Sequence, residues 1–295
     1  MKYVHLDDHT VLTGGTHLTS MALFEDRIND VEPIPSSKLT NDHIYEFKDR
    51  LWIIGNIMDL YQLDGSTISE LLNTCSFVKI EFDYNYCQAR GEVSHEHFLK
   101  CRCECPYGPT GKSIIANTYN LINKNAKHIF FMSERQRSIF SFHMPLLPFD
   151  RSSILTSTFT KDSLELFKIN RSAKNNNKWA ILAGDGGWHS YAKGVEQAVN
   201  FCTANNLEYE VLPNRPYQQH IEHLSEFKGI VFLPIIHDTC PRCIIEAKLL
   251  DIEVITNTNS QHVTEDWWSQ DIDKIEEYIS NRPKYFWDTL DGLSV

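Results

Sequence analysis

Two carboxylates separated by seven residues, Asp238 and Glu246, belong to the segment of this sequence best suited to ligand chemistry. Asp238 lies on a short polar loop after the apolar run 229–234, and Glu246 lies in the predicted helix that opens near Arg242. A carboxylate held on a rigid helix can accept hydrogen bonds from both hydroxyls of a ribose. The free N–H groups of a helix's first turn suit a diphosphate, and Arg242 and the backbone at Thr239 can add donors there.

A parallel sheet is needed to bring these residues together, and the second half of the chain has the pattern for one. Strands are expected at 179–183, 208–212, 229–234 and 253–257, with helices at 193–205 and 217–227 between them. Such βα units bind ligands at the carboxyl edge of the sheet, where Asp238 and Glu246 would lie. The alternative is a solvated loop aspartate and a surface glutamate on an amphipathic helix.

A second candidate element follows the first strand of this half. The strand ends in Gly-Asp-Gly-Gly at 184–187, which includes Gly186, and leads to Lys193-Gly194 at a helix start. A lysine at that edge can reach a diphosphate as a point charge. The alternative is a turn followed by an exposed lysine.

A third element lies near the N-terminus, where Gly14 and Gly15 follow an apolar strand at 2–6. Glycines at such a turn let the backbone approach a phosphate or a sugar closely. Further strands at 51–54, 77–82 and 128–132 predict a parallel sheet with crossover helices in this half as well.

Two histidines flank these loops and are candidates for catalysis together with Asp238. His237 immediately precedes Asp238, and His189 lies between the glycine turn and Lys193. Each of them can equally be a surface or packing residue.

Taken in this order, the three elements resemble the retaining GT-B glycosyltransferases of the family-4 type. The resemblance covers residues 178–262 well and the first half loosely. It implies two Rossmann-like domains with the active site in the cleft between them. It also implies that Glu246 holds the ribose of the donor, Asp238 lies near the transferred sugar and Lys193 binds the diphosphate. Gly14 and Gly15 would line the cleft.

The sequence departs from the family pattern at three points. The first acid is Asp238 instead of glutamate, no arginine precedes Lys193, and Asp251 stands where a glycine is usual before the last strand. These departures bear on the identity of the donor more than on the fold.

The resemblance implies transfer of a hexosyl or pentosyl unit from a nucleotide diphosphate sugar, with retention of configuration and without a catalytic metal. The acceptor is open among a glycan, a lipid-linked glycan, a protein and a modified nucleobase. One alternative is a GT-B nucleotide-sugar epimerase. Another is a zinc-stabilised binding protein without enzymatic activity. The compact size is similar to that of small phage and viral glycosyltransferases.

Composition limits the class of protein further. The chain has 295 residues, 42% hydrophobic and 23% charged, as in soluble globular proteins. Its net charge of −11 argues against a protein covered in phosphate contacts. No apolar run reaches the roughly 18 residues of a membrane span, and the N-terminus lacks the apolar core of a secretory signal. We therefore expect a cytoplasmic protein, in the host cytoplasm if the source is viral.

The domain boundaries follow from changes in composition. Residues 1–150 form the expected acceptor-side domain, and the Ser-, Asn- and Lys-rich stretch 151–177 is expected to be a linker. Residues 178–270 form the expected nucleotide-sugar domain. A C-terminal helix and aromatic tail at 271–295 are expected to pack back on the first domain.

Cysteine and histidine residues cluster between positions 87 and 105. The set that best suits a structural zinc is Cys87, His97, Cys101 and Cys103, with His95 and Cys105 as substitutes. The alternatives are a disulfide and ordinary reduced cysteines.

Two other motifs are expected to carry no chemistry. The segment 108–113 looks like part of a phosphate-binding loop but lacks the preceding apolar strand. Asp271 and Asp273 form an Asp-x-Asp pattern in an acidic helix, which we interpret as a solvated face.

Overall fold

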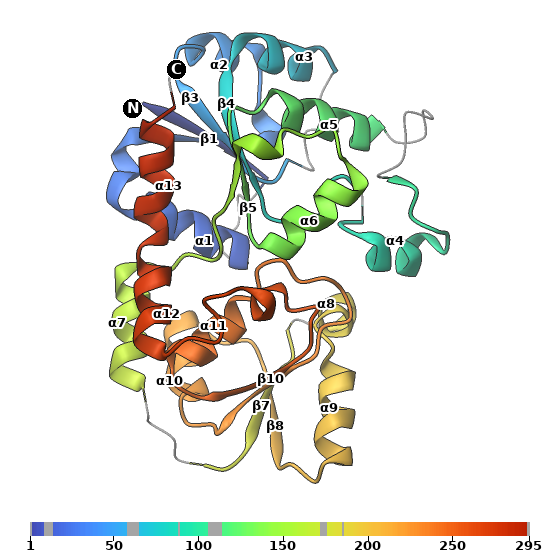
Figure 1. Ribbon diagram of the computed structural model, residues 1–295, viewed down its shortest axis with the longest axis vertical. Helices are drawn as coiled ribbons and strands as arrows, with labels where there is room; N and C mark the ends of the chain where they lie inside the picture. Colours follow the sequence, from blue (N-terminus) through green and yellow to red (C-terminus); the bar gives the residue numbers. More distant parts are fainter. Residues whose placement is uncertain are drawn as a thin grey trace. The chain divides into compact units, whose positions relative to one another are not determined.

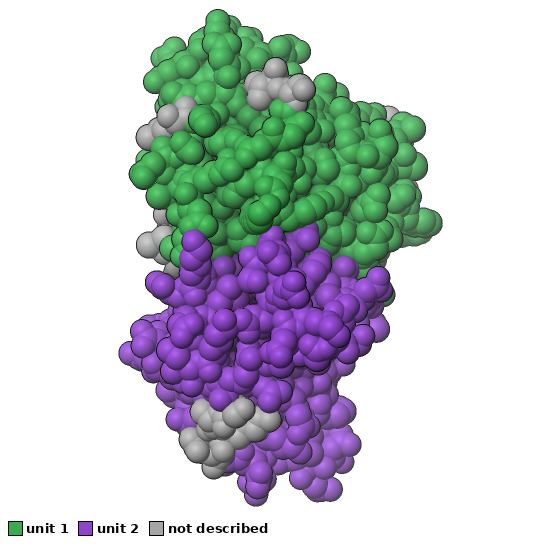
Figure 2. All heavy atoms as spheres, turned by 60° about the vertical axis from the view of Figure 1, so that its left-hand side comes forward, with its two compact units in different colours: residues 1–156, 283–295 green, residues 157–282 purple. Residues whose placement is uncertain are grey.

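The computed structural model divides into two compact units. It describes residues 2–8, 14–57, 65–87, 89–105, 114–171, 176–184 and 186–293. Residues 1–156 and 283–295 form unit 1, and residues 157–282 form unit 2 (Figure 2). Each unit contains one parallel sheet, so the predicted α/β class with two Rossmann-like units is confirmed. No helix in the described parts of the chain is long and apolar enough to cross a membrane.

Unit 1 is built on a six-stranded parallel sheet in the order β2-β1-β3-β4-β5-β6 (Figure 1). The strands are β1 (Tyr3–Asp7), β2 (Val31–Pro35), β3 (Leu51–Ile54), β4 (Ser76–Glu81), β5 (Ile129–Phe131) and β6 (Ser152–Ile154). The helices are α1 (Gly15–Phe24), α2 (Asn41–Glu46), α3 (Gly65–Thr74), α4 (Glu92–Leu99), α5 (Ile114–Asn125), α6 (Glu134–His143) and α13 (Arg282–Asp291). Short 3-10 helices lie at Glu25–Asp30, Ser36–Lys38 and Phe149–Arg151.

The central strand β4 carries a fully buried ion pair, Lys79 and Glu81. Lys79 Nζ lies 3.6 Å from Glu81 Oε2 and donates hydrogen bonds to the carbonyl oxygens of Gly55 and Ile80. Burial lowers the pKa of Lys79 and raises that of Glu81, because the interior disfavours both charges. Asn85 donates to the other oxygen of Glu81 at 2.9 Å, so the pair belongs to a buried polar network.

Helix α13 returns to unit 1 and packs against β1 and α1. Trp287 donates its indole N–H to the carbonyl oxygen of Leu23 at 2.7 Å, and its ring contacts that of Tyr3. Asp291 accepts hydrogen bonds from Tyr3 at 2.8 Å and from two nitrogens of Arg27 at 3.0 and 2.6 Å. The aromatic end of the chain is thus part of the structure of unit 1.

Unit 2 contains a four-stranded parallel sheet in the order β10-β9-β7-β8. The strands are β7 (Trp179–Leu182), β8 (Tyr209–Leu212), β9 (Gly229–Phe232) and β10 (Glu253–Thr256). The helices are α7 (Lys161–Asn170), α8 (Gly187–Ala192), α9 (Val195–Ala204), α10 (Tyr217–Leu224), α11 (Arg242–Leu249) and α12 (Ile272–Ser280), and a 3-10 helix lies at Gln261–Thr264.

Successive side chains along the strands of unit 2 point to opposite faces of the sheet, and each face has its own core. Trp179, Ile181 and Val231 point to one face and pack with Ala198 and Cys202 of α9. The neighbouring strand positions point to the other face and pack against α7, α10, α11 and α12. Figure 1 shows α9 on one side of this sheet and α10 and α11 on the other.

This arrangement creates a topological switch point at the carboxyl ends of β7 and β9. From β7 the chain passes through α9 to β8 on one side, and it then returns through α10 to β9 on the other side. The segments that follow β7 and β9 therefore diverge to opposite faces of the sheet. In open α/β folds, ligands bind in the crevice at such a point.

The stretch expected to be a linker, 151–177, contains regular structure. Strand β6 is the last strand of the sheet of unit 1, and α7 buries Phe167 in the core of unit 2. Serines dominate β6 and Thr160 caps α7, and these residue types are as common at edges and caps as in linkers. In the same way, α12 of the expected tail buries Ile275 and Ile279 in unit 2.

Candidate functional site

An ion pair joins the two loops at the switch point of unit 2. Lys193 Nζ lies 2.6 Å from Asp238 Oδ2. Lys193 follows α8, in the connection that leaves β7, whereas Asp238 lies in the connection that leaves β9. The lysine side chain is 43% exposed and that of the aspartate 10%, so the cation faces solvent while the carboxylate is set into the protein.

Gly194 explains how the lysine reaches this position. Its φ of +70° is in the left-handed region, and a Cβ atom there would lie 1.7 Å from the carbonyl oxygen of Leu233. Ile235 also donates its N–H to the carbonyl oxygen of Ala192 at 3.0 Å. The α8–α9 junction can therefore lie directly on the end of β9 only because residue 194 has no side chain.

The loop that carries Asp238 is fixed by backbone hydrogen bonds. Asp238 donates its N–H to the carbonyl oxygen of Asn259 at 2.8 Å, and its own carbonyl oxygen accepts from Gln261 N–H at 3.1 Å. The side-chain oxygen Oδ1 accepts from the N–H of Cys240 at 3.3 Å. These bonds orient the carboxylate before any ligand binds.

Glu246 lies one turn into α11 and is held by two neighbours. Tyr217 donates its hydroxyl to Glu246 Oε1 at 3.0 Å, and Arg242 Nε lies 3.6 Å from the same oxygen. Glu246 is 5% exposed. Burial raises the pKa of Tyr217, and the negative charge of Glu246 raises it further. The phenol therefore stays protonated and acts as a donor.

Tyr217 is a residue that the sequence analysis missed. It opens α10, 29 residues before Glu246, and no motif links the two positions. The only local signal is Pro216, which precedes the helix and is a common helix-start residue.

The expected contact of Arg242 with a diphosphate would require an exposed guanidinium, and the Arg242 side chain is buried. It is 7% exposed, donates Nη1 to the carbonyl oxygen of Thr158 and lies 4.0 Å over the ring of Phe159. Together with its contact to Glu246, this makes Arg242 a buried group that anchors the start of α11 to the segment before α7.

The remaining predicted residues occupy varied environments. Thr239 is buried, His237 is half-buried beside Asp238, and His189 is exposed on α8. Gly186 caps α8 with a φ of +83°, a conformation that favours glycine.

Gly14 and Gly15 belong to unit 1. Gly14 precedes α1 with a φ of −122°, which any residue adopts, and a Cβ atom on it would meet nothing within 4 Å. Gly15 is the first residue of α1. Neither the backbone conformation nor packing therefore explains the glycine at position 14.

In the cysteine and histidine cluster, two of the four expected ligands, Cys87 and Cys103, converge with the two substitutes, His95 and Cys105. The atoms that meet are those of Cys87, His95, Cys103 and Cys105. His95 and His97 are two residues apart on α4 and so point about 200° apart around the helix axis. His95 is the buried one, while the His97 ring packs against Phe98 and Cys101 is exposed.

The two motifs expected to carry no chemistry have different outcomes. Asp271 caps α12, where its side chain accepts from Lys274 N–H, and the Asp273 side chain is 90% exposed. The segment 108–113 lies outside the described residues.

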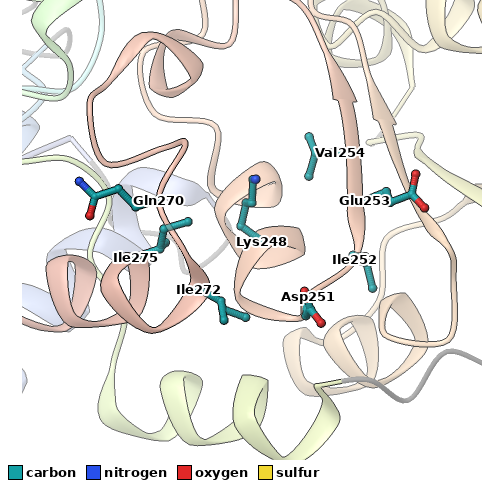
Figure 3. A pocket seen from close by; sticks show the side chains of 8 residues that line it. All are labelled: Lys248, Asp251, Ile252, Glu253, Val254, Gln270, Ile272 and Ile275. Carbon is teal, nitrogen blue, oxygen red and sulfur yellow. The ribbon is translucent and has the colours of Figure 1, made fainter.

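A hollow of about 450 Å³ elsewhere in unit 2 contains none of the predicted site residues. It is lined by Lys248, Asp251, Ile252, Glu253, Val254, Gln270, Ile272 and Ile275, which are labelled in Figure 3. The hollow lies at the start of β10 and the residues just before that strand, whereas the Lys193–Asp238 pair lies at the carboxyl ends of strands. The switch-point rule therefore does not assign it to ligand binding.

Two α/β units, each with one parallel sheet, give this chain the fold of the GT-B glycosyltransferases. Solved structures with this fold include Anabaena HepE in complex with UDP, with a TM-score of 0.57, 12% identity and coverage of 99% of this chain and 100% of that chain. AviGT4, a glycosyltransferase involved in avilamycin A biosynthesis, has a TM-score of 0.54 and 9% identity, with coverage of 99% of this chain and 98% of that chain.

An alpha-glucosyltransferase in complex with UDP and a 13-mer DNA containing an HMU base gives a TM-score of 0.51, 10% identity and coverage of 98% of this chain and 94% of that chain. No protein-family model matches the sequence, and no curated protein matches it. At these identities, the likeness establishes the fold.

Proposed function

We propose that the protein is a glycosyltransferase that moves a hexosyl or pentosyl unit from a nucleotide diphosphate sugar to an acceptor. The observation that carries this proposal is the Lys193–Asp238 pair at the switch point of unit 2, with Glu246 behind it on α11. HepE and the alpha-glucosyltransferase bind UDP, which makes UDP the first nucleotide to test.

In this proposal, Lys193 leaves Asp238 when the donor binds and contacts the diphosphate. An ammonium group at this position would stabilise the charge that develops on the leaving nucleotide diphosphate. Asp238, already oriented by its loop, would accept a hydroxyl of the transferred sugar. In the structure, the ammonium group of Lys193 pairs with the carboxylate of Asp238 at 2.6 Å.

Glu246 would accept the ribose hydroxyls, with Tyr217 and Arg242 as positioning residues that keep its carboxylate in one orientation. Because Glu246 is only 5% exposed, the ribose would reach one edge of the carboxylate. Thr239 and Gly186 would add backbone contacts to the donor. Within unit 1, the open space at residue 14 would let the backbone of Gly14 and Gly15 approach a sugar closely.

We propose retention of configuration on the basis of the spaced-acid pattern. The bond between the anomeric carbon and the diphosphate oxygen breaks, a bond to the acceptor oxygen forms on the same face, and the proton of the acceptor hydroxyl passes to the leaving diphosphate. His237, half-buried beside Asp238, and the exposed His189 are the candidates that contact the reacting groups. No residue in this scheme requires a catalytic metal.

The acceptor is proposed to be a glycan, a lipid-linked glycan or a protein in preference to a modified nucleobase. The alpha-glucosyltransferase of similar fold was solved with DNA. The net charge of −11 opposes association with a polyanion such as DNA.

Calorimetric titration of UDP, GDP, ADP and CMP into the protein, at physiological salt and without added metal, tests the donor site. We expect selective binding of one nucleotide, lost in Glu246→Ala and weakened in Lys193→Ala. Lys228→Ala is the matched control, because the Lys228 side chain is 42% exposed and also pairs with a carboxylate, Glu253. Binding of none of the four nucleotides would overturn the proposal and favour a non-enzymatic binding protein.

A second experiment separates a transferase from an epimerase of the same fold. The protein is incubated with the sugar conjugates of the selected nucleotide, with and without a panel of acceptor glycans. Release of free nucleotide that depends on acceptor supports transfer. Inversion of one stereocentre of the sugar in the absence of any acceptor supports epimerisation instead.

A further inference from the structure

A second cluster of chemically active side chains lies in unit 1, among residues with no part in the proposed donor site. Ligand atoms of Cys87, His95, Cys103 and Cys105 all lie within 4.8 Å of one another. Cys87, His95 and Cys103 are buried, and Cys105 is half-buried. We propose that these four residues bind one zinc ion in a structural site.

The distances match the edges of a zinc tetrahedron. Zinc–sulfur bonds of about 2.3 Å and zinc–nitrogen bonds of about 2.0 Å place sulfurs roughly 3.8 Å apart, and sulfur and nitrogen roughly 3.5 Å apart. The Sγ atoms of Cys87 and Cys103 are 3.7 Å apart. His95 Nδ1 lies 3.3 Å from the sulfur of Cys87 and 3.6 Å from that of Cys105. Zinc therefore fits with only small side-chain movements.

The ligand set indicates a structural ion. Three thiolates and one imidazole fill all four positions of tetrahedral zinc, so no position remains for water or substrate. The second ring nitrogen of His95 lies 3.5 Å from Cys101 Sγ. A ligating histidine commonly has its other nitrogen fixed by a neighbouring group. Here Cys101 is that neighbouring group and is not itself a metal ligand.

The surroundings of α4 show what the ion would stabilise. Only Ser94 and His95 of this helix are buried, while Phe98 and Leu99 are exposed. An eight-residue helix without a buried apolar face is not stable by itself. Zinc would tie α4 to Cys87, which follows β4, and to the segment 101–105.

Zinc content of the full chain is the first test. The protein is purified from zinc-supplemented cells without chelator, and zinc is measured by mass spectrometry. We expect about one zinc per chain, as a single tetrahedral site requires, and a loss of most of it in His95→Ala. His97→Ala is the matched control, because it changes the same residue type on the same helix and should retain zinc.

Cobalt substitution tests the ligand set. Tetrahedral cobalt bound to thiolates absorbs strongly in the visible and shows a thiolate-to-metal charge-transfer band. We expect both signals in the wild type, a weaker charge-transfer band in Cys105→Ser and an unchanged spectrum in Cys101→Ser. Loss of the spectrum in Cys101→Ser, with full retention in Cys105→Ser, would overturn the assignment of ligands.

Metal removal from the wild type keeps the proposal testable if the variants fail to fold. A chelator should accelerate hydrogen exchange at 92–105 and leave the exchange of α2 unchanged. A soluble wild-type chain without bound zinc and without cobalt absorption would overturn the site. So would a disulfide between Cys87 and Cys103, detected by mass after thiol blocking.

Discussion

Gly194 lies so close to the carbonyl oxygen of Leu233 that a Cβ atom on residue 194 would be 1.7 Å from that oxygen. This contact brings the segment after β7 onto the end of β9, where Lys193 meets Asp238. We expect Gly194→Ala to destabilise the protein by about 2 kcal/mol or more, since it adds a backbone clash to the cost of a positive φ. Urea unfolding measures the change.

Gly187→Ala is the control for that substitution. Gly187 has a φ of +52°, but a Cβ atom on it would meet nothing within 4 Å. We expect a cost of about 1 kcal/mol from the backbone alone. Equal losses in the two variants would contradict the role assigned to the Gly194–Leu233 contact.

The Lys193–Asp238 pair should matter far more for ligand binding than for stability. A half-exposed ion pair contributes about 0–1 kcal/mol to folding. We therefore expect Lys193→Ala to unfold at nearly the wild-type urea concentration, while its affinity for the selected nucleotide falls about tenfold or more, as loss of a contact to a charged group does. A large loss of stability with unchanged nucleotide affinity would contradict this prediction.

Tyr217→Phe isolates the hydroxyl that positions Glu246. The substitution leaves the ring packing intact and removes one hydrogen bond to a buried carboxylate, so we expect a loss of stability of about 1–3 kcal/mol. Nucleotide affinity should fall less than in Glu246→Ala. His223→Phe, on the same helix, is a control that leaves the contacts of Glu246 with Tyr217 and Arg242 unchanged. An unaltered stability in Tyr217→Phe would show that the hydrogen bond is not formed in solution.

The buried pair of β4 gives a prediction for unit 1. Lys79→Met leaves Glu81 buried without its cation, and we expect a destabilisation of about 3–5 kcal/mol. Adding Glu81→Gln removes the uncompensated charge and keeps an acceptor for Asn85. We expect the double variant to be more stable than Lys79→Met alone. Additive losses in this double-mutant cycle would show that the two side chains do not interact.

Acid should weaken the attachment of α13. Hydrogen bonds from Arg27 lower the pKa of Asp291 to about 2, below its unfolded value of about 3.9. Because the folded-state pKa is depressed, the stabilisation is present above pH 3.9 and is lost as pH falls towards 2. The Asp291 side chain is 47% exposed, so solvent screening limits the effect to about 1 kcal/mol.

Comparison of the wild type with Asp291→Asn measures this effect. The difference in free energy of unfolding should be greatest near pH 6 and should shrink as pH falls below about 4, where the carboxylate begins to protonate in the unfolded chain. A difference that stays constant over this range would contradict the assigned ion pair.

Several features of this protein were predictable because they depend on short stretches of chain. Alternating apolar strands and helices identified the parallel sheets, and the spacing of Asp238 and Glu246 placed one on a loop and the other on the helix behind it. Lys193-Gly194 was recognised as a pair, although the reason for the glycine was not visible. In each case the backbone periodicity of a single βα unit determines the outcome.

Tertiary structure alone decided which distant side chains meet. Tyr217 reaches Glu246, and Arg242 turns inward to the carbonyl oxygen of Thr158, because α7, α10 and α11 pack together in one core of unit 2. His95 joins the cysteines in place of His97 because the two side chains point about 200° apart around the axis of α4, and only that of His95 is turned towards Cys87, Cys103 and Cys105. The sequence by itself determined the local elements and the residue types available at each loop. The partners of each side chain depended on strand order and helix rotation, which are properties of the whole sheet and are not encoded in any one segment.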